Sequence, residues 1–286
     1  MNGLTILGGH GFVGSAYTKM FYDASIGNIA NVNRRDDHKV YSADILYLLS
    51  TVHNYNVFTD PHLDINTNLN TLVTVLENWK DYQEKTREKG CFNFVSSWSV
   101  YGNQKELPVN ESAVCDPHGW YIITKRCAEQ LLVEYCSTFD LQYRILRFAN
   151  IVGPGDAKVS SKKNLLQHNI NLLSQGKDVE LYGDGKFYRD FMYVEDCVRA
   201  VDLVMSKGNV NEIYNIGNGQ PANWYIEILK YASRNFTGKI TFKEATAFQK
   251  SVPVGSFYMN NDKLKSLGYV PNYLGNKLYD SLIQEK

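Results

Sequence analysis

The first half of the chain alternates short β-rich runs with longer stretches of helical spacing. The runs that predict strands are residues 4–7, 28–33, 46–49, 92–96 and 142–148. The stretches that predict helices follow a glycine-rich turn as far as about residue 22, and then cover residues 68–88 and 121–139. Strands that alternate with helices in this way predict a parallel sheet with helices packed on it.

The pattern becomes less regular after about Val152. Short motifs rich in glycine and aromatic residues appear there, together with helical stretches at residues 164–175, 194–206 and 224–235. We therefore predict one domain over residues 1–152, to which the chain returns near residues 190–222. Residues 153–286 are expected to form most of a smaller C-terminal lobe.

A glycine-rich loop directly follows the first predicted strand and opens a helix. Gly8, Gly11 and Gly14 are spaced three residues apart. Glycines in this context permit a tight turn and let the backbone approach a pyrophosphate at the positive end of a helix. The loop predicts a dinucleotide site in a doubly wound parallel α/β fold of the Rossmann type. A tight turn that binds no ligand is the alternative.

The end of the second predicted strand should contact the adenosine ribose of such a cofactor. An acidic residue there favours NAD, whereas an arginine accommodates the 2′-phosphate of NADP. The chain has Asn33, Arg34 and Arg35 at this point, which favours NADP, although an exposed basic turn explains the same residues. Farther along, Asp44 is expected to lie near the adenine.

Tyr121 and Lys125 are four residues apart in a predicted helix, so their side chains share one face. A phenol is a poor base near neutral pH because its reference pKa is about 10. An ammonium about 4 Å away, at an effective dielectric constant of about 20, favours the phenolate by about 4 kcal/mol. That is about three pKa units, which would make Tyr121 a usable proton acceptor. The same spacing also occurs by chance in many helices.

The composition argues against several classes of protein. Apolar residues make up 44% of the 286 residues and charged residues 21%, as in a soluble globular protein. Lys and Arg number 30, as do Asp and Glu, so the net charge gives no reason to expect nucleic acid or a membrane surface as a partner. No apolar run approaches the roughly 20 residues that span a bilayer. The first strand begins too early to leave room for a signal peptide.

The five cysteines are scattered along the chain and form no C-x-x-C pair. A reduced, cytoplasmic setting without a metal site is the simplest interpretation.

A series of short motifs runs along nearly the whole chain. They are Gly8, Gly11, Gly14, residues 68–77, residues 95–102, Glu111, Pro117, Tyr121, Lys125, Glu129, residues 147–154, residues 182–185, residues 189–191, residues 194–196, residues 214–217, residues 267–269 and Pro271. In this order they resemble the extended short-chain dehydrogenase/reductase family, in the NAD-dependent epimerase/dehydratase branch that works on nucleotide sugars.

The resemblance implies a role for each matching residue. Ser97 resembles the hydroxyl that, together with Tyr121, hydrogen-bonds the reacting sugar oxygen. Tyr121 resembles the catalytic acid and base, and Lys125 resembles the residue that binds the nicotinamide ribose. The residues implied for binding NAD or NADP are Gly8, His10, Gly11, Phe12, Val13, Gly14, Asn33, Arg34, Arg35, Asp44, Ile45, Leu49, Asn68, Tyr121, Lys125, Phe148 and Ile151. Those implied for a nucleotide-diphosphate sugar are Ser97, Trp98, Ser99, Asn150, Asn164, Leu165, Tyr182 and Arg189.

The resemblance also implies that residues 1–152 bind the cofactor and residues 153–286 mostly bind the sugar nucleotide. The helices predicted at residues 68–88 and 121–139 resemble those that form a homodimer in this family. Their apolar stripe is equally explained by packing on the sheet. His53 follows the strand at residues 46–49, where the cofactor edge is expected.

The chain departs from the family at the residues after the catalytic hydroxyl. Members that carry out 4,6-dehydration have an Asp-Glu pair there, and decarboxylases have a glutamate, whereas this chain has Trp98 and Ser99. Elimination of water needs an acid and a base beyond the tyrosine. The sequence therefore predicts an epimerase, with an NADPH-dependent reductase of a keto-deoxy nucleotide sugar as the alternative. A non-catalytic nucleotide-sugar-binding protein is a third possibility.

A second departure is the short distance between Arg35 and the strand at residues 46–49. Family members usually have another strand and helix in this interval, so we expect a truncated crossover. A third is the absence of an arginine over residues 250–261 for a second diphosphate contact, where Lys250 is a candidate substitute.

Overall fold

The computed structural model describes residues 3–21, 29–32, 38–156, 159–220, 225–244, 247 and 255–284. Within these residues the largest sheet is parallel, with the strand order β2-β1-β3-β4-β5-β9. Its strands are β1 (Leu4–Leu7), β2 (Ile29–Val32), β3 (Ile45–Tyr47), β4 (Cys91–Ser97), β5 (Gln142–Phe148) and β9 (Glu212–Ile216). The predicted parallel α/β fold is confirmed.

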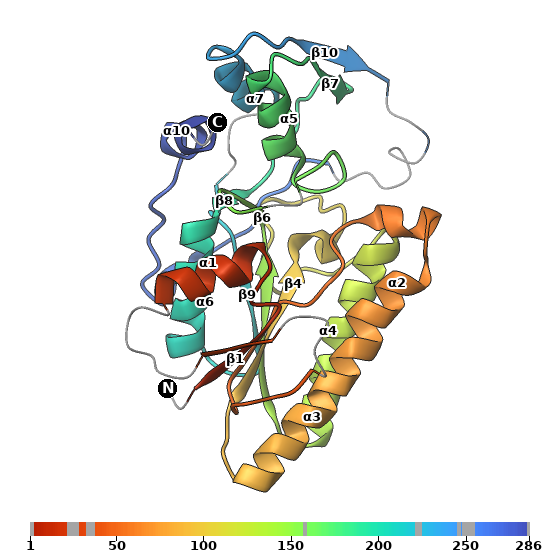
Figure 1. Cartoon of the computed structure of the whole chain (residues 1–286), viewed down its shortest axis with the longest axis vertical. Helices are drawn as coiled ribbons and strands as arrows, with labels where there is room; N and C mark the ends of the chain where they lie inside the picture. Colours follow the sequence, from red (N-terminus) through yellow and green to blue (C-terminus); the bar gives the residue numbers. More distant parts are fainter. Residues whose placement is uncertain are drawn as a thin grey trace.

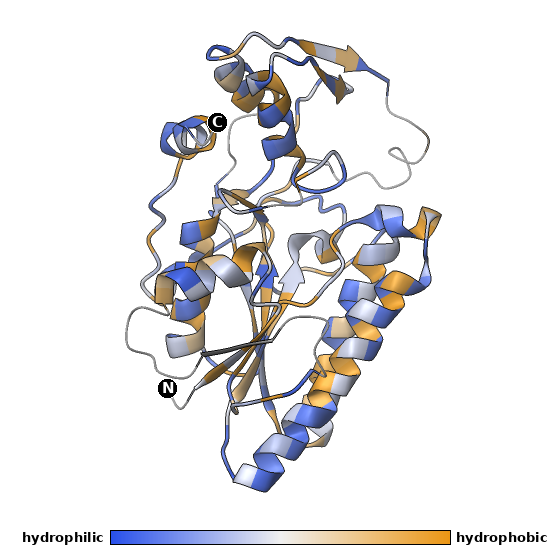
Figure 2. Ribbon diagram, in the orientation of Figure 1, coloured by the Kyte–Doolittle hydropathy of each residue, from blue (hydrophilic) through white to orange (hydrophobic). Residues whose placement is uncertain are grey.

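Helices cover both faces of this sheet (Figure 1). They are α1 (Phe12–Phe21) and α6 (Val194–Lys207) on one face, and α3 (Thr71–Thr86) and α4 (Trp120–Thr138) on the other. Leu46 packs in the cluster under α1 and α6, whereas its neighbours Ile45 and Tyr47 pack under α3 and α4. Successive side chains of a strand point to opposite faces, so a sheet covered twice needs apolar residues throughout. Figure 2 shows these strands as mainly hydrophobic.

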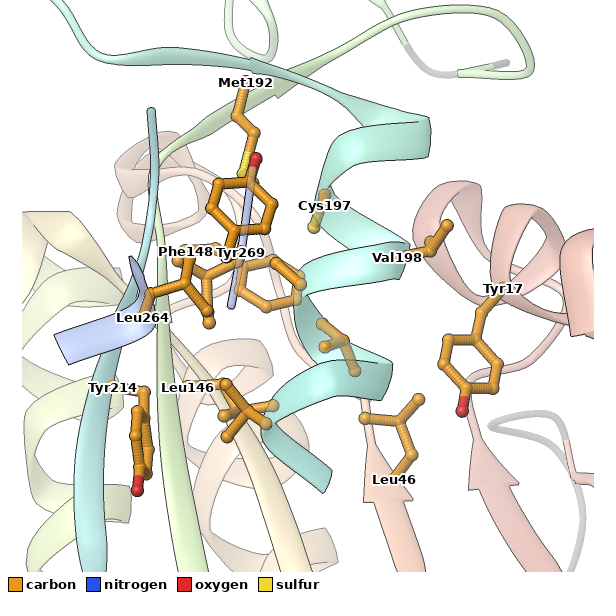
Figure 3. Close-up of a cluster of buried hydrophobic side chains, with 14 of the residues drawn as sticks. Tyr17, Leu46, Leu146, Phe148, Met192, Cys197, Val198, Tyr214, Leu264 and Tyr269 are labelled. Carbon is orange, nitrogen blue, oxygen red and sulfur yellow. The ribbon is translucent and has the colours of Figure 1, made fainter. Parts of the chain in front are cut away.

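The first of these two cores joins segments that are far apart in the sequence. Figure 3 shows Tyr17 of α1, Val198 of α6 and the sheet residues Leu46 and Leu146 in one cluster. Leu264, from the short helix α9 (Asp262–Ser266), closes its other side. The C-terminal part of the chain thus returns to stabilise the N-terminal sheet.

The described part of the sheet differs from the usual doubly wound arrangement in its strand order. That arrangement has the strand order 3-2-1-4-5-6. Here β2 is the edge strand of the described sheet, and β3 lies beside β1, in the place of the fourth strand. Residues 38–44 lead into β3 through turns and bends, with no strand or helix. The expected truncated crossover is confirmed for these residues, and residues 33–37 lie outside the described part of the chain.

A second lobe packs beyond the carboxyl ends of the large sheet (Figure 1). Its elements are α5 (Leu165–Ser174), α7 (Tyr225–Ser233), α10 (Asn276–Gln284), and the parallel strand pairs β6 (Asn150–Val152) with β8 (Phe191–Tyr193) and β7 (Val179–Tyr182) with β10 (Ile240–Lys243). Leu166, Leu173 and Leu229 belong to a separate core of this lobe. A boundary at residue 152 stays a prediction, since β8, α6 and β9 come later in the chain.

Short irregular elements line the junction between the large sheet and the second lobe. They are the 3₁₀ turns η1 (Asn54–Phe58) and η3 (Trp98–Tyr101), the helix α2 (His62–Ile65) and the π-helical turn η2 (Asn66–Asn70), which leads directly into α3. The helix predicted at residues 68–88 therefore begins in a π turn, a feature that occurs frequently at functional sites. Across the described residues, no helix has the length and apolar character required to cross a membrane.

Candidate active site

A cavity of about 990 Å³ lies at the carboxyl ends of β1, β3, β4 and β5 and extends to the second lobe. Ligands of open α/β sheets bind at this edge. The predicted site residues that line the cavity are Gly8, His10, Gly11, Phe12, Val13, Gly14, Leu49, Ser97, Trp98, Ser99, Tyr121, Lys125, Phe148, Asn150, Ile151, Asn164, Leu165 and Arg189. Residues from seven separated parts of the sequence thus meet around one space.

The glycine loop forms one wall of the cavity. Gly8 has a φ of +89°, a backbone conformation that residues with a side chain rarely adopt. A Cβ atom on Gly14 would lie 2.4 Å from the Gly8 carbonyl oxygen, so only glycine lets α1 pack this closely on the loop. The helix therefore begins at the cavity with backbone N–H groups available for an anion. This cradle fits the pyrophosphate of a dinucleotide.

Ser97 and Tyr121 both line the cavity. Ser97 ends β4, and its Oγ lies 2.8 Å from Ser99 Oγ. Tyr121 lies in the first turn of α4, where its backbone N–H donates to Asn54 Oδ1 at 3.1 Å. The hydroxyls of Ser50 and Ser97 line the same cavity as the Tyr121 phenol, and both lower its pKa.

Burial determines the proton affinity of Tyr121 in this arrangement. It raises the pKa of the phenol to about 12, and the hydrogen bonds from Ser50 and Ser97 oppose this rise. The buried carboxylate of Asp64 adds to it. The prediction that Lys125 lowers the pKa of Tyr121 is wrong for the chain by itself, because desolvation outweighs the other effects and the Lys125 ammonium is directed elsewhere.

Lys125 turns toward the sheet. Its Nζ donates to the Val95 carbonyl at 2.7 Å and lies 4.3 Å from the centre of the Phe94 ring. Burial lowers the pKa of Lys125 to about 7, while Glu129 one turn later opposes this shift. Glu129 is itself occupied by two hydrogen bonds from Arg147, at 2.9 and 2.7 Å. The shared helix face places Lys125 on the cavity but does not pair it with Tyr121.

Aromatic rings hold Arg189 at the opposite side of the cavity. Its guanidinium lies 4.5 Å from the centre of the Phe187 ring and 5.5 Å from that of Trp98. Nη1 donates to the Gly255 carbonyl at 2.5 Å, and burial lowers the pKa of Arg189 to about 10. Trp98 in turn packs on Phe257, with ring centres 4.6 Å apart. A planar cation with a fixed orientation suits bidentate binding of a phosphate.

Asn150 and Asn164 are fixed on the second lobe's side of the cavity. Asn150 Nδ2 donates to the Asp190 carbonyl at 3.1 Å. Asn164 precedes α5 in a left-handed conformation, with a φ of +55°, and its Nδ2 donates to Gln167 Oε1 at 2.9 Å. Both amides face the cavity from positions set by other polar groups.

Two predicted cofactor residues lie at the wrong end of the sheet. Asp44 directly precedes β3, and its Oδ1 accepts the backbone N–H of Cys91 at 3.0 Å. Ile45 is completely buried between the sheet and α3. The cavity lies at the carboxyl end of β3, so neither residue reaches it. The register of the strand could not be read from the sequence.

Asn68 and Tyr182 are also outside the cavity lining. Asn68 is 2% exposed, and its amide bonds Thr51 and Thr124 rather than a ligand. Tyr182 ends β7, and its ring lies 4.9 Å from Lys243 Nζ at the surface. Asn33, Arg34 and Arg35, which favoured NADP, lie outside the described residues, as does Lys250.

The cavity contains residues that the sequence analysis did not select. Ser50, Thr51 and Asn54 follow β3, and their position after a strand was an available signal. Lys162, Lys163 and Tyr225 come from the second lobe, and no sequence pattern distinguished them. Lys163 pairs with Asp156 at 2.5 Å. His53, which the sequence had singled out, lines the cavity, and its Nδ1 is buried without a partner among the described residues.

Metal chemistry receives no support from the residues that the structure describes. Within them, no group of three His, Cys, Asp or Glu side chains is arranged to bind an ion. The five cysteines all fall in described segments and are unpaired, and Cys91, Cys136 and Cys197 are buried.

Residues 38–217 match the NAD dependent epimerase/dehydratase family. The chain belongs to this family. The match confirms the family predicted from the motifs, and it covers the strands and loops that build most of the cavity.

Three relatives illustrate the range of the family. A dTDP-D-glucose 4,6-dehydratase of Dictyostelium discoideum is 27% identical over 75% of this chain and 58% of its own length. An uncharacterized UDP-glucose epimerase of Bacillus subtilis is 31% identical over 54% of this chain and 46% of its own length. A putative UDP-glucose 4-epimerase of Methanocaldococcus jannaschii is 27% identical over 94% of this chain and 93% of its own length. The matches thus span about half of the first two relatives and almost all of the third.

Solved structures share the fold. A UDP-glucose 4-epimerase of Thermotoga maritima, determined with UDP-glucose, has a TM-score of 0.82, with 23% identity over 98% of this chain and 96% of that chain. A UDP-glucose 4-epimerase of Thermus thermophilus, determined with NAD, has a TM-score of 0.79, with 20% identity over 98% of each chain. The similarity confirms the predicted Rossmann-type fold.

Proposed function

We propose that the chain is an NAD(P)-dependent nucleotide-sugar epimerase that acts by hydride transfer at a sugar carbinol, with C4 as the reacting carbon. The observation that carries the proposal is the placement of Ser97, Tyr121 and Lys125 on the same cavity as the glycine loop. A cation held by aromatic rings, Arg189, faces this cavity from the second lobe. Residues 1–152 would bind the cofactor and residues 153–286 most of the sugar nucleotide.

The proposed mechanism assigns the proton to Tyr121. Its phenol accepts the proton of the sugar hydroxyl, while Ser97 hydrogen-bonds the same oxygen. A nicotinamide cofactor, which the glycine loop and Lys125 would hold, would supply the hydride acceptor and donor at the sugar carbon, and its positive charge in the oxidised state would favour the phenolate. Lys125 would bind the nicotinamide ribose by giving up its bond to the Val95 carbonyl. Because the pKa of the Tyr121 phenol is about 12, it needs the positive charges of the oxidised nicotinamide and of Lys125 to act as a base.

The lining of the cavity argues against dehydration. Among the described residues that line it, Asp156 is the only carboxylate, and it is paired with Lys163. Trp98 packs against Phe257, and Ser99 is hydrogen-bonded to Ser97. Elimination of water needs a second acid and base, and these residues do not supply them at neutral pH. Epimerisation needs only Ser97, Tyr121 and Lys125 together with the cofactor.

The cofactor is NAD or NADP. A relative solved with NAD supports NAD, whereas Arg34 and Arg35 favour NADP. NADP would in turn favour the net reduction of a keto-deoxy nucleotide sugar. The substrate is a nucleotide-diphosphate sugar, as in the relative solved with UDP-glucose.

A homodimer would cover Val73 of α3 together with Ile123, Leu131 and Val133 of α4, which are exposed apolar residues. Molecular mass in solution tests the dimer.

Absorbance of the reduced cofactor tests the reaction. With a nucleotide sugar, an epimerase leaves the total cofactor unchanged and interconverts two sugars, whereas a reductase consumes NADPH in proportion to product. Failure of every nucleotide sugar to react would favour a binding protein without catalysis.

Tyr121→Phe tests the assigned acid and base. Loss of general acid–base catalysis should lower kcat by about 10²–10⁴-fold and leave substrate affinity nearly unchanged. Tyr135→Phe is the matched control, because Tyr135 lies on the same helix and its buried hydroxyl has no partner among the described residues. Full turnover by Tyr121→Phe would contradict the mechanism.

A further inference from the structure

We propose that Asn54 is a positioning residue for the reaction, because its side chain holds the backbone of Tyr121 at the start of α4. The inference rests on the proposed function, in which Tyr121 exchanges a proton with the sugar. Asn54 Oδ1 accepts the backbone N–H of Tyr121 at 3.1 Å, and both residues line the cavity. Asn54 reaches this helix from the segment after β3, 67 residues earlier in the chain.

The first turn of α4 is held by groups from outside the helix. Its N-cap is Gly119, which has no side chain to accept the free N–H groups of this turn. A Cβ atom on Gly119 would lie 2.6 Å from Asn54 Oδ1, so the amide of Asn54 lies directly against the turn. Trp120 Nε1 donates to the Pro61 carbonyl at 2.8 Å. Residues 54–61 therefore contact the beginning of α4 at two points.

The segment that carries Asn54 is itself anchored. Asn54 opens the turn η1, in which Asn56 Nδ2 donates to Asp64 Oδ1 at 3.0 Å. Asn56 and Asp64 are both buried, and the Asn56 carbonyl accepts the N–H of Asp60 at 2.7 Å. Buried polar groups that satisfy one another make a segment rigid. Asn54 thus offers its oxygen to Tyr121 from a fixed place.

The carbonyl of Tyr121 is held through a second set of hydrogen bonds. Thr124 Oγ1 donates to this carbonyl at 2.9 Å and accepts from Asn68 Nδ2 at 2.9 Å. Asn68 Oδ1 in turn accepts the N–H of Thr51, which also follows β3, at 2.9 Å. The N–H and the C=O of Tyr121 are therefore both tied to the segment after β3, the N–H directly through Asn54.

This anchoring matters because Ser97 and Tyr121 come from different elements. Ser97 ends β4, whereas Tyr121 lies on α4, and residues 102–118 between them form no helix. Two groups that act on one sugar oxygen must keep a fixed relative position, and a shift of about 1 Å can cost about 100-fold in rate. Because Asn54 acts through the backbone of Tyr121, its loss should lower the rate of the reaction more than the affinity for the substrate.

Asn54→Ala in the complete chain removes the acceptor of the Tyr121 N–H. It should lower kcat by about 10-fold and leave KM for the reacting nucleotide sugar nearly unchanged, because a displaced phenol weakens the chemical step and not the binding of the diphosphate. The same substitution should leave the fold intact, since the bonds of Asn56 and Asn68 remain.

Asn211→Gly is the matched control. Asn211 Oδ1 also accepts the backbone N–H of a tyrosine, Tyr143, at 3.2 Å, but near the start of β5 and so at the opposite edge of the sheet from the cavity. Asn211 has a φ of +60°, which glycine keeps without strain. This variant should leave both kcat and KM unchanged.

Hydrogen exchange gives a second readout that needs no substrate. With isotope-labelled tyrosines, the amide resonance that disappears in Tyr121→Phe belongs to Tyr121. Asn54→Ala should speed the exchange of this amide by about 5-fold, and Asn211→Gly should not. Asn54→Asp keeps an oxygen acceptor at the same reach and should restore the slower exchange.

The two readouts separate the positioning role from the proposed function. If no nucleotide sugar reacts with the wild type, the proposed function fails, and the exchange rates alone decide whether Asn54 holds Tyr121. An unchanged exchange rate of the Tyr121 amide in Asn54→Ala overturns the positioning role. An unchanged kcat, or a rise in KM without a fall in kcat, also overturns it.

Discussion

At the scale of single residues, burial decides the protonation of the two groups at the centre of the candidate site. Tyr121 holds its proton more tightly than a free phenol, and Lys125 holds its proton less tightly than a free amine. Both shifts favour the neutral form, as desolvation requires. Burial thus favours the uncharged form of both groups, and the charges of a bound cofactor and substrate should change this balance.

Lys125 should make stability depend on pH. Its pKa is about 7 in the folded chain against 10.5 for a free amine, so between these values the unfolded chain binds more protons. The free energy of unfolding should rise with pH across this window, by about 5 kcal/mol at most. Lys125→Met should remove the rise. Urea unfolding at several pH values between 7 and 10 measures it.

Lys177→Met is the control for this experiment, because Lys177 is an exposed lysine of the second lobe. The unfolding free energy of Lys177→Met should change with pH in the same way as that of the wild type. Parallel curves for Lys125→Met and the wild type would show that Lys125 does not lose its proton in the folded chain.

At the scale of elements, two unusual turns position the site. The glycine loop brings α1 against β1, and the π turn at Asn66–Asn70 places Asn68 between the loop after β3 and α4. The sequence predicted the glycine loop, because glycines at this spacing between a strand and a helix are typical of such a loop. It did not predict the second turn, because a π turn needs one extra residue per turn and leaves no fixed residue signature.

Gly14→Ala should damage the cofactor site. The added Cβ would lie 2.4 Å from the Gly8 carbonyl oxygen, and the backbone must move to accept it. Overpacking of this kind costs about 1–3 kcal/mol in stability. We also expect weaker binding of NAD and NADP, measured by titration calorimetry. Ser15→Ala, one residue later and exposed, is the control; equal affinities for the two variants would contradict the role given to the loop.

At the scale of the whole molecule, the cavity depends on contacts between distant parts of the chain. Ser50 and Ser97 come from the sheet, Tyr121 from α4, and Arg189 and Tyr225 from the second lobe. Among the described residues, β2 is the edge strand of the large sheet. Substrate and cofactor should therefore stabilise the chain by bridging the lobes.

Thermal unfolding with ligands tests this expectation. A ligand that binds only the folded chain raises stability by about 2.7 kcal/mol at 100 times its Kd. Nucleotide-diphosphate sugars should raise the unfolding temperature more than the free sugars, because Arg189 is suited to the diphosphate. Ranking UDP-, dTDP- and GDP-sugars would identify the base. No shift with any of them would contradict a sugar-nucleotide site.

Most of the fold was predictable from the sequence because its signals are local. Residues 92–96 and 142–148 lie within β4 and β5 as the structure has them; Gly8 and Gly11 lie between β1 and α1, and Gly14 lies in the first turn of α1. Asp44 and Tyr182 were misplaced, because the end of a strand and the side of a parallel strand pair on which a residue lies both depend on register. Ser50 was not selected, because a serine after a strand resembles many others.

By itself, the sequence determined the family, the parallel sheet, the glycine cradle and the identity of Ser97, Tyr121 and Lys125, because each depends on residue types at fixed spacing. Only the tertiary structure decided how deeply the Tyr121 phenol is buried and where the Lys125 ammonium points. Proton affinities depend on burial and on partners from separate strands and helices. Folding brings such partners together, and their spacing along the chain does not predict these contacts.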